Sequence, residues 1–173
     1  MAELPDHLAA LTRFSLATGL RQANATGLRW DQIDMTRAVA WIHADQAKGG
    51  KAIPVPLNSE ALAVVREQIG RNPTVVFTFD GRPILQPNTK AWRKALVRAG
   101  IDDFRWHDLR HTWASWHVQA GTPLHVPQES GGWETPAMVR RYAHLAPEHL
   151  AKHAARISWS APNLHHGKLI AIR

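Results

Sequence analysis

Apolar residues recur at helical spacing in several segments of the chain. Leu8, Leu11 and Phe14 follow Asp6 at a constant interval, which predicts a helix that Asp6 caps and Gly19 ends. Similar spacing, with glycine or proline near the boundaries, predicts further helices over residues 21–27, 60–70, 89–100, 107–121, 123–130, 135–145 and 147–157. We therefore expect a mainly α fold.

A different pattern separates the second of these helices from the third. Residues 28–34, 38–44 and 51–57 are short runs rich in β-branched and aromatic side chains, which predicts a small three-stranded antiparallel β-sheet. The sequence KGGK at 48–51 is expected to form the hairpin turn between the last two strands. Its glycines permit the positive φ angles that a tight turn requires.

The charge balance indicates a class of partner. The 173 residues include 21 Lys and Arg against 14 Asp and Glu, a net charge of +7, and eleven His. A basic domain of this size favours a polyanionic partner, nucleic acid first, although solubility alone is the simpler explanation. The chain has no cysteine, which excludes disulfides and thiolate metal sites. It shows neither a signal-peptide pattern nor an apolar run long enough for a membrane span, so we expect a cytoplasmic protein with no membrane partner.

Six residues stand in short motifs spread along the chain. They are Arg21 in ATGLR, Lys48 in KGGK, His107 and Arg110 in HDLRHT, Trp133 in GGW, and Tyr142 in MVRRYAHL. In this order and with these spacings, over roughly residues 7–152, the set resembles the catalytic domain of the tyrosine recombinases, the phage-integrase family. The resemblance implies the fold of that domain.

The resemblance also implies a reaction. In this family a tyrosine oxygen attacks a DNA phosphodiester, leaving a 3′-phosphotyrosyl bond and a free 5′-hydroxyl, and the strand is rejoined without ATP, metal or cofactor. Tyr142 matches the nucleophile. Arg21 and Arg110 match the two arginines that stabilise the phosphate, as planar guanidiniums can by binding two oxygens each. These cations are expected to favour the phenolate of Tyr142.

The remaining matches concern proton transfer and positioning. Lys48 matches the general acid for the leaving 5′-oxygen, but Lys51 on the same turn competes for that role. His107 matches a position that hydrogen-bonds the phosphate or assists proton transfer. Trp133 stands where histidine is more usual, and because an indole N–H donates one hydrogen bond without carrying a proton, we expect a positioning role.

Three other features leave alternatives open. His107 and His111 have the spacing of a zinc helix, but the HExxH glutamate and a third ligand are missing, so no metal is expected and His111 is interpreted as a supporting or packing residue. Arg140 and Arg141 are either solvated or in contact with DNA. The tryptophans at 106, 113 and 116 are expected in the core.

The family implies double-stranded DNA and further recombinase protomers, in a tetrameric synapse, as partners in the nucleoid. Residues 1–157 are expected to form the catalytic domain, and 158–173 a C-terminal tail that packs on a neighbouring molecule or along a sheet edge as an added strand. The family's N-terminal core-binding domain has no room before Asp6, so we expect an isolated catalytic domain. A type IB topoisomerase-like enzyme and a non-catalytic DNA-binding remnant are the alternative functions.

Overall fold

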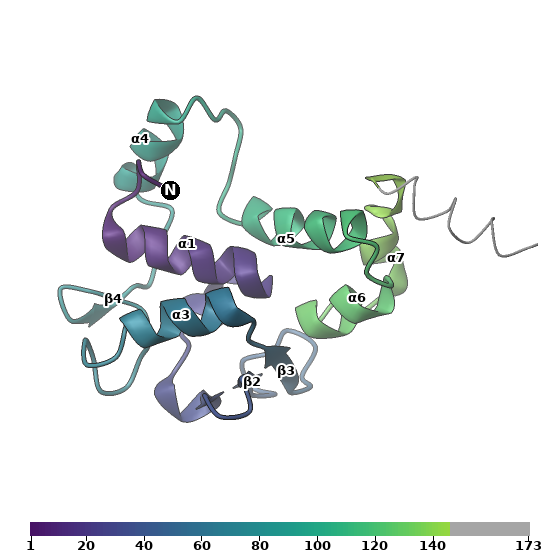
Figure 1. The fold of residues 1–173 in the computed structure, drawn as a ribbon, viewed down its shortest axis with the longest axis horizontal. Coiled ribbons are helices and arrows are strands. Elements are labelled where there is room, and N and C mark those ends of the chain that lie inside the picture. The colour runs from purple at the N-terminus through teal and green to yellow at the C-terminus, as the bar shows by residue number, and fades with distance from the viewer. Residues whose placement is uncertain (146–173) are drawn as a thin grey trace, which may run out of the picture.

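Helices are the main regular structure of residues 1–145, the part of the chain that this computed structural model describes (Figure 1). The expected helix over 147–157 and the tail over 158–173 lie outside the described residues. The helices are α1 (Asp6–Thr18), α2 (Gln22–Thr26), α3 (Ser59–Glu67), α4 (Lys90–Arg98), α5 (Asp108–Gln119), α6 (His125–Gly131) and α7 (Pro136–Arg140), with 3-10 turns η1 (Trp30–Gln32) and η2 (Ala143–Leu145). Asp6 is the first residue of α1 and makes no capping bond, since Pro5 holds the N-cap position.

The predicted three-stranded antiparallel sheet is confirmed, with order β1 (Ile33–Asp34), β2 (Val39–Ile42) and β3 (Ile53–Pro56). The expected strand over 28–34 is reduced to β1, because η1 precedes it: the buried Gln32 side chain accepts a hydrogen bond from the Arg29 N–H at 3.0 Å and closes a turn there. A separate pair, β4 (Thr78–Phe79) and β5 (Arg82–Pro83), forms a short hairpin.

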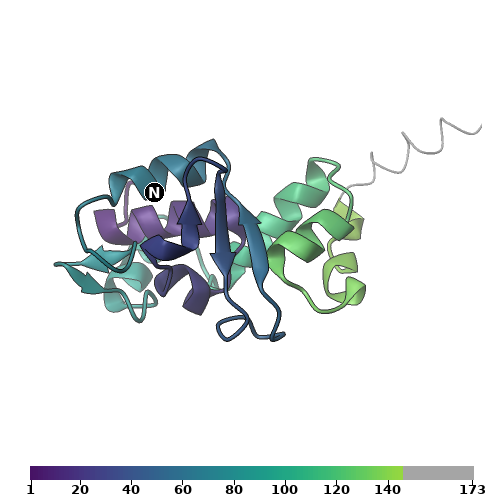
Figure 2. The same cartoon turned by 90° about the horizontal axis from the view of Figure 1, so that it is seen from below.

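The connection between β2 and β3 is longer than the predicted turn. Ile42 pairs with Ile53, so residues 43–52 form a loop beyond the last pair, rather than the tight turn predicted over 48–51. Of the two glycines in this loop, only Gly50 has a positive φ, at 64°. Figure 2 shows the loop projecting past the ends of the strands.

Two apolar clusters meet along α5. The larger one surrounds α1, whose Phe14 ring lies 5.0 Å from that of Phe77. The smaller one contains Trp113, Val139 and Tyr142 and lies among α5, α6 and α7 (Figure 1). Leu109, near the start of α5, belongs to the larger cluster, so this helix ties the α6–α7 end of the molecule to the main core.

Gly19 fixes the contact between α1 and α5. It ends α1 in the left-handed conformation, at φ +64°, where glycine has no Cβ penalty. A Cβ at this position would lie 2.3 Å from the Trp113 ring. The predicted helix end is confirmed, and the packing shows why a side chain is excluded there.

Gly19→Ala should therefore destabilise the protein far more than Gly100→Ala. Gly100 also has φ +64° but nothing within 4 Å of a Cβ, so alanine there adds only the left-handed backbone strain, about 1 kcal/mol. Overpacking against Trp113 adds about 1–3 kcal/mol at Gly19. Urea denaturation measures both losses in the free energy of unfolding, and equal losses would contradict the tight contact.

Candidate active site

Two arginines from distant parts of the chain reach glycine carbonyls at the same place. The Arg110 Nη1 donates to the Gly19 carbonyl at 2.6 Å, and the Arg21 Nη2 donates to the Gly132 carbonyl at 2.8 Å. Arg21 is the N-cap of α2, directly after the α1 terminus, whereas Gly132 directly follows α6. The two bonds bring the α1–α2 junction, α5 and the end of α6 together.

The site has a strong positive potential. Burial, with the neighbouring charge of Arg21, lowers the pKa of Arg110 to about 9, which still leaves the guanidinium charged at neutral pH. The Arg110 Nη2 is buried and has no hydrogen-bond partner among the described residues. A buried donor next to a second cation is an arrangement that an anion such as a phosphate would satisfy.

Trp133 covers Arg110 from the side of α6. Its ring centroid lies 3.9 Å from the guanidinium carbon, and its ring stacks on Trp113 at 5.8 Å. The two preceding glycines leave no room for a side chain: a Cβ on Gly131 would lie 2.4 Å from the Trp133 ring, and one on Gly132, at φ +63°, would lie 2.4 Å from Ile53. The GGW motif is thus a steric requirement for placing the indole on the arginine.

The loop after β2 places Lys48 next to this turn. Lys48 is exposed and borders a cleft of about 500 Å³ lined by Lys48, Gly49, Lys51, Ile53, Gly132, Trp133 and Glu134. Lys48 and Lys51 both face the cleft, so the choice between them as general acid stays a prediction.

His107 is the N-cap residue of α5, and its ring meets that of His111 edge-on at 4.9 Å. Burial, followed by the charge of Arg110, lowers the pKa of His107. Within residues 1–145, no group of three or more His, Cys, Asp or Glu side chains could hold a metal ion.

Tyr142 is not helical. The expected helix over 135–145 ends at Arg140, and Tyr142 lies in the turn before η2 with 7% of its surface exposed. Its hydroxyl is hydrogen-bonded to the His111 Nδ1. The charges of Arg141 and Arg110 lower the pKa of Tyr142 and so favour its phenolate, in the expected direction, but burial outweighs them and raises the pKa in this conformation.

Sequence reasoning missed the contact of His111 with Tyr142. The second histidine of HDLRHT was its only signal, since the spacing puts His111 beside His107 on the helix surface. Arg140 and Arg141 are exposed, and the Arg141 guanidinium carbon lies 5.7 Å from the Tyr142 ring centroid.

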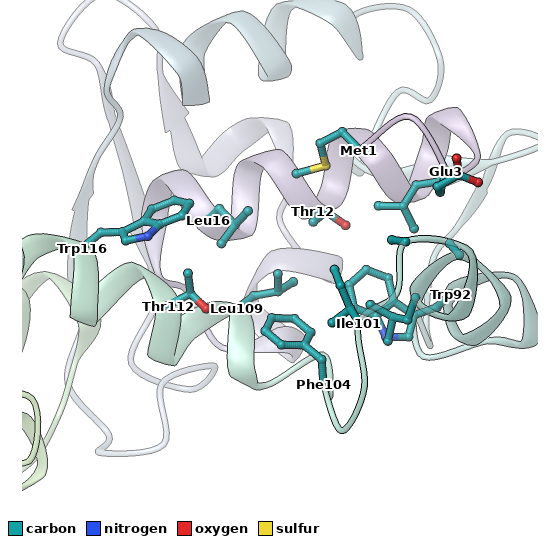
Figure 3. Close-up of a pocket in the computed structure, with 14 residues that line it drawn as sticks. Met1, Glu3, Thr12, Leu16, Trp92, Ile101, Phe104, Leu109, Thr112 and Trp116 are labelled. Carbon is teal, nitrogen blue, oxygen red and sulfur yellow. The ribbon is translucent and has the colours of Figure 1, made fainter.

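A second, apolar cavity of about 220 Å³ lies among α1, α4 and α5 (Figure 3). Trp106 and Trp113 are buried as predicted, but Trp116 is 53% exposed and lines this cavity. None of the six predicted site residues borders it, so it is separate from the arginine site.

The arginine site and the surrounding fold agree with the comparisons with known proteins. Residues 2–149 match the model of the phage integrase family. The chain belongs to this family. It is 50% identical to the integrase of Salmonella phage P22, over 96% of the chain and 47% of that protein. It is 31% identical to a shufflon-specific DNA recombinase of Escherichia coli, over 80% of the chain and 35% of that protein.

Solved structures show the same fold. The catalytic domain of bacteriophage HP1 integrase matches with a TM-score of 0.69 and 27% identity, over 94% of the chain and 91% of that domain. The XerH site-specific recombinase matches with a TM-score of 0.69 and 21% identity, over 90% of the chain and 48% of that protein. The chain thus spans about half the length, or less, of the curated relatives named above. No helix among residues 1–145 is long and apolar enough to cross a membrane.

Mild acid should destabilise the protein through α5. Burial lowers the pKa values of His107, His111 and His117, so the unfolded chain binds protons before the folded one as pH falls. The stability from the neutral imidazoles is complete above pH ~6.5 and is lost as pH falls through the lower, folded pKa values.

Urea denaturation at pH values of about 7.5 and 5.5 should show this loss in the free energy of unfolding, well above the range in which carboxylates titrate. His117→Gln should reduce the difference between the two pH values. A free energy of unfolding that rises on acidification would contradict the lowered pKa values of these histidines.

Proposed function

We propose that the chain is the catalytic part of a site-specific DNA recombinase that cleaves and rejoins strands through a 3′-phosphotyrosyl intermediate. The main support is that Arg21 and Arg110 meet at the Gly132 and Gly19 carbonyls, and that Trp133, which covers Arg110, lies 6.4 Å from the ring of the chain's one tyrosine, Tyr142. Identity of 50% to a phage integrase supports the same reaction class.

The residues divide the reaction between them. A phosphodiester bound by the two guanidiniums would use the unpaired Arg110 Nη2, and the charge that develops on its oxygens would be stabilised without a metal ion. The Tyr142 oxygen attacks phosphorus, and the bond to the 5′-oxygen breaks. Lys48 donates the proton that this oxygen requires. Trp133 keeps Arg110 in place through the ring contact at 3.9 Å.

The partner we propose is double-stranded DNA. The net charge of +7 suits phosphate contacts, and a recombinase of the same fold, XerH, has been solved bound to its difH substrate. Further recombinase protomers would complete a synapse on bacterial or phage DNA. We propose that residues 1–157 correspond to the catalytic domain and that a core-binding domain acts with it.

Tyr142→Phe should abolish covalent attachment to DNA while leaving DNA affinity and folding nearly unchanged, because it removes one oxygen. Nicked duplexes of random sequence provide the substrate, and attached DNA is recovered after denaturation in SDS. Arg110→Ala should also remove attachment, but it should weaken DNA binding as well. An adduct formed by the Tyr142→Phe protein would falsify the nucleophile, and no adduct from the unmodified chain would favour a non-catalytic remnant.

Lys48→Ala should be rescued by a better leaving group. The duplex found attached to the unmodified chain is synthesised again with sulfur in place of the 5′-oxygen at the cleaved phosphodiester. A thiolate leaves without being protonated, so this substrate needs no general acid. Cleavage by Lys48→Ala should be about 10²-fold slower or worse on the oxygen substrate, in the range of general acid catalysis, and near normal on the sulfur one. Lys51→Ala is the matched control from the same loop. Rescue of Lys51→Ala alone would transfer the role to Lys51.

A further inference from the structure

The hydrogen bond between His111 and Tyr142 has no part in the proposed mechanism so far. The Nδ1 of His111, on α5, contacts the hydroxyl of Tyr142, in the turn after α7. The two ring centroids lie 6.0 Å apart. The atom that His111 touches is the oxygen that would attack phosphorus.

The surroundings of His111 keep its imidazole neutral. Burial lowers its pKa first, and the charges of His107, Arg141 and Arg110 act in the same direction, whereas Asp108 opposes them. A neutral imidazole can accept at Nδ1 only in the tautomer with its proton on Nε2. His111 is therefore prepared to receive a hydrogen bond, and then a proton, from the phenol.

Tyr142 in turn needs a proton acceptor. Burial raises its pKa, and among the described residues Arg141 and Arg110 lower it. A phosphodiester bound at Arg110 would partly cancel the second of these charges, so the phenol would be still harder to ionise before attack. The proton must leave as the new bond forms, to a group already in contact with the oxygen.

We propose that His111 is the general base of strand cleavage, with its Nδ1 taking the proton of the Tyr142 hydroxyl while the Tyr142 oxygen bonds to phosphorus. The proposal rests on the proposed function of Tyr142 as the nucleophile. His107 is a weaker candidate for this role, because it is exposed at the helix N-cap, where its ring contacts that of His111.

The step balances without another reactant. The Tyr142 O–H bond breaks and its proton passes to the His111 Nδ1, the oxygen–phosphorus bond forms, and the bond from phosphorus to the 5′-oxygen breaks. That oxygen receives the Lys48 proton and leaves as a hydroxyl. In rejoining, neutral Lys48 takes the hydroxyl proton back, and the His111 imidazolium returns its proton to the departing Tyr142 oxygen.

The test compares the rates at which His111→Gln and the unmodified chain attach to DNA in a single turnover. The substrate is the nicked duplex that is found attached to the unmodified chain. Glutamine can accept the phenol's hydrogen bond but cannot take up its proton. At neutral pH, the variant should be about 10²–10⁴-fold slower, the range of general base catalysis. Its rate should then rise with hydroxide, so that the difference between the two rates narrows as the pH approaches the ionisation of Tyr142, whose pKa burial raises above that of a free tyrosine. The unmodified chain should stay level above the ionisation of His111.

His117→Gln is the matched control, because His117 is a half-buried histidine of the same helix with its Nδ1 on Thr122 rather than on Tyr142. It should attach DNA at the unmodified rate. If His111→Gln unfolds, His111→Ala with added imidazole replaces it, and rescue by imidazole supports the base. If the rates of His111→Gln and the unmodified chain differed by the same factor at every pH, His111 would have a structural role only. Faster attachment by His111→Gln would mean that the bond restrains the tyrosine. Either result overturns the proposal.

Nitrogen NMR of the histidines separates this proposal from the proposed function. In the unmodified chain without DNA, the His111 Nδ1 should be unprotonated and its signal should shift in Tyr142→Phe. If the chain attaches no DNA but this signature is present, the recombinase reaction fails while the proton-acceptor geometry stands. A protonated Nδ1 at neutral pH overturns the proposal whatever the activity.

Discussion

The site depends on two guanidiniums that are held close together although they repel each other. Each is secured by a charge-assisted hydrogen bond to a glycine carbonyl, Arg110 to Gly19 and Arg21 to Gly132, and such bonds contribute about 1.5–3 kcal/mol each. The repulsion and the burial remain visible in the lowered pKa of Arg110. A bound phosphate would offset the repulsion between the two guanidiniums and accept a hydrogen bond from the unpaired Arg110 Nη2. The folded site therefore has a positive charge and a free donor that the proposed DNA substrate would bind.

The same constraint explains the glycines and the aromatic layer. Carbonyls point at the arginines only where the chain turns in the left-handed region, and both turns sit against rings or aliphatic chains that exclude a Cβ. Trp113 packs against Gly19 and also stacks on Trp133, which covers Arg110. Apolar packing between α5 and the turns therefore sets the positions of the charges, and a loss of packing at Gly19 or Gly132 would move a guanidinium.

Much of this could be predicted from the sequence because the helices follow local periodicity and glycine boundaries. The second and third strands of the sheet were predicted in the correct places. The strand predicted over 28–34 was mostly wrong, because the side chain of Gln32 closes a turn there that the sequence pattern does not indicate. The loop of residues 43–52 depends on where Ile42 and Ile53 pair, which is a tertiary property. The motifs located the arginines and Tyr142. The contact with His111 could not be predicted, because the turn after Arg140 decides which residue of α5 the phenol reaches.

The proposed reversible transfer to Tyr142 would place a further demand on the site. If the phenolate were strongly stabilised, the phosphotyrosyl bond would break easily but the first attack would be slow, since a weakly basic oxygen is a poor nucleophile. Burial at Tyr142 has the opposite effect: it keeps the oxygen basic and leaves the proton to be moved within the step. In the proposed reaction, the neutral imidazole of His111 would take the proton, and the two arginines would stabilise the charge on phosphorus. His111 and Arg110 both lie on α5. This shared helix fixes the positions of the proposed base and of one phosphate-binding guanidinium relative to each other.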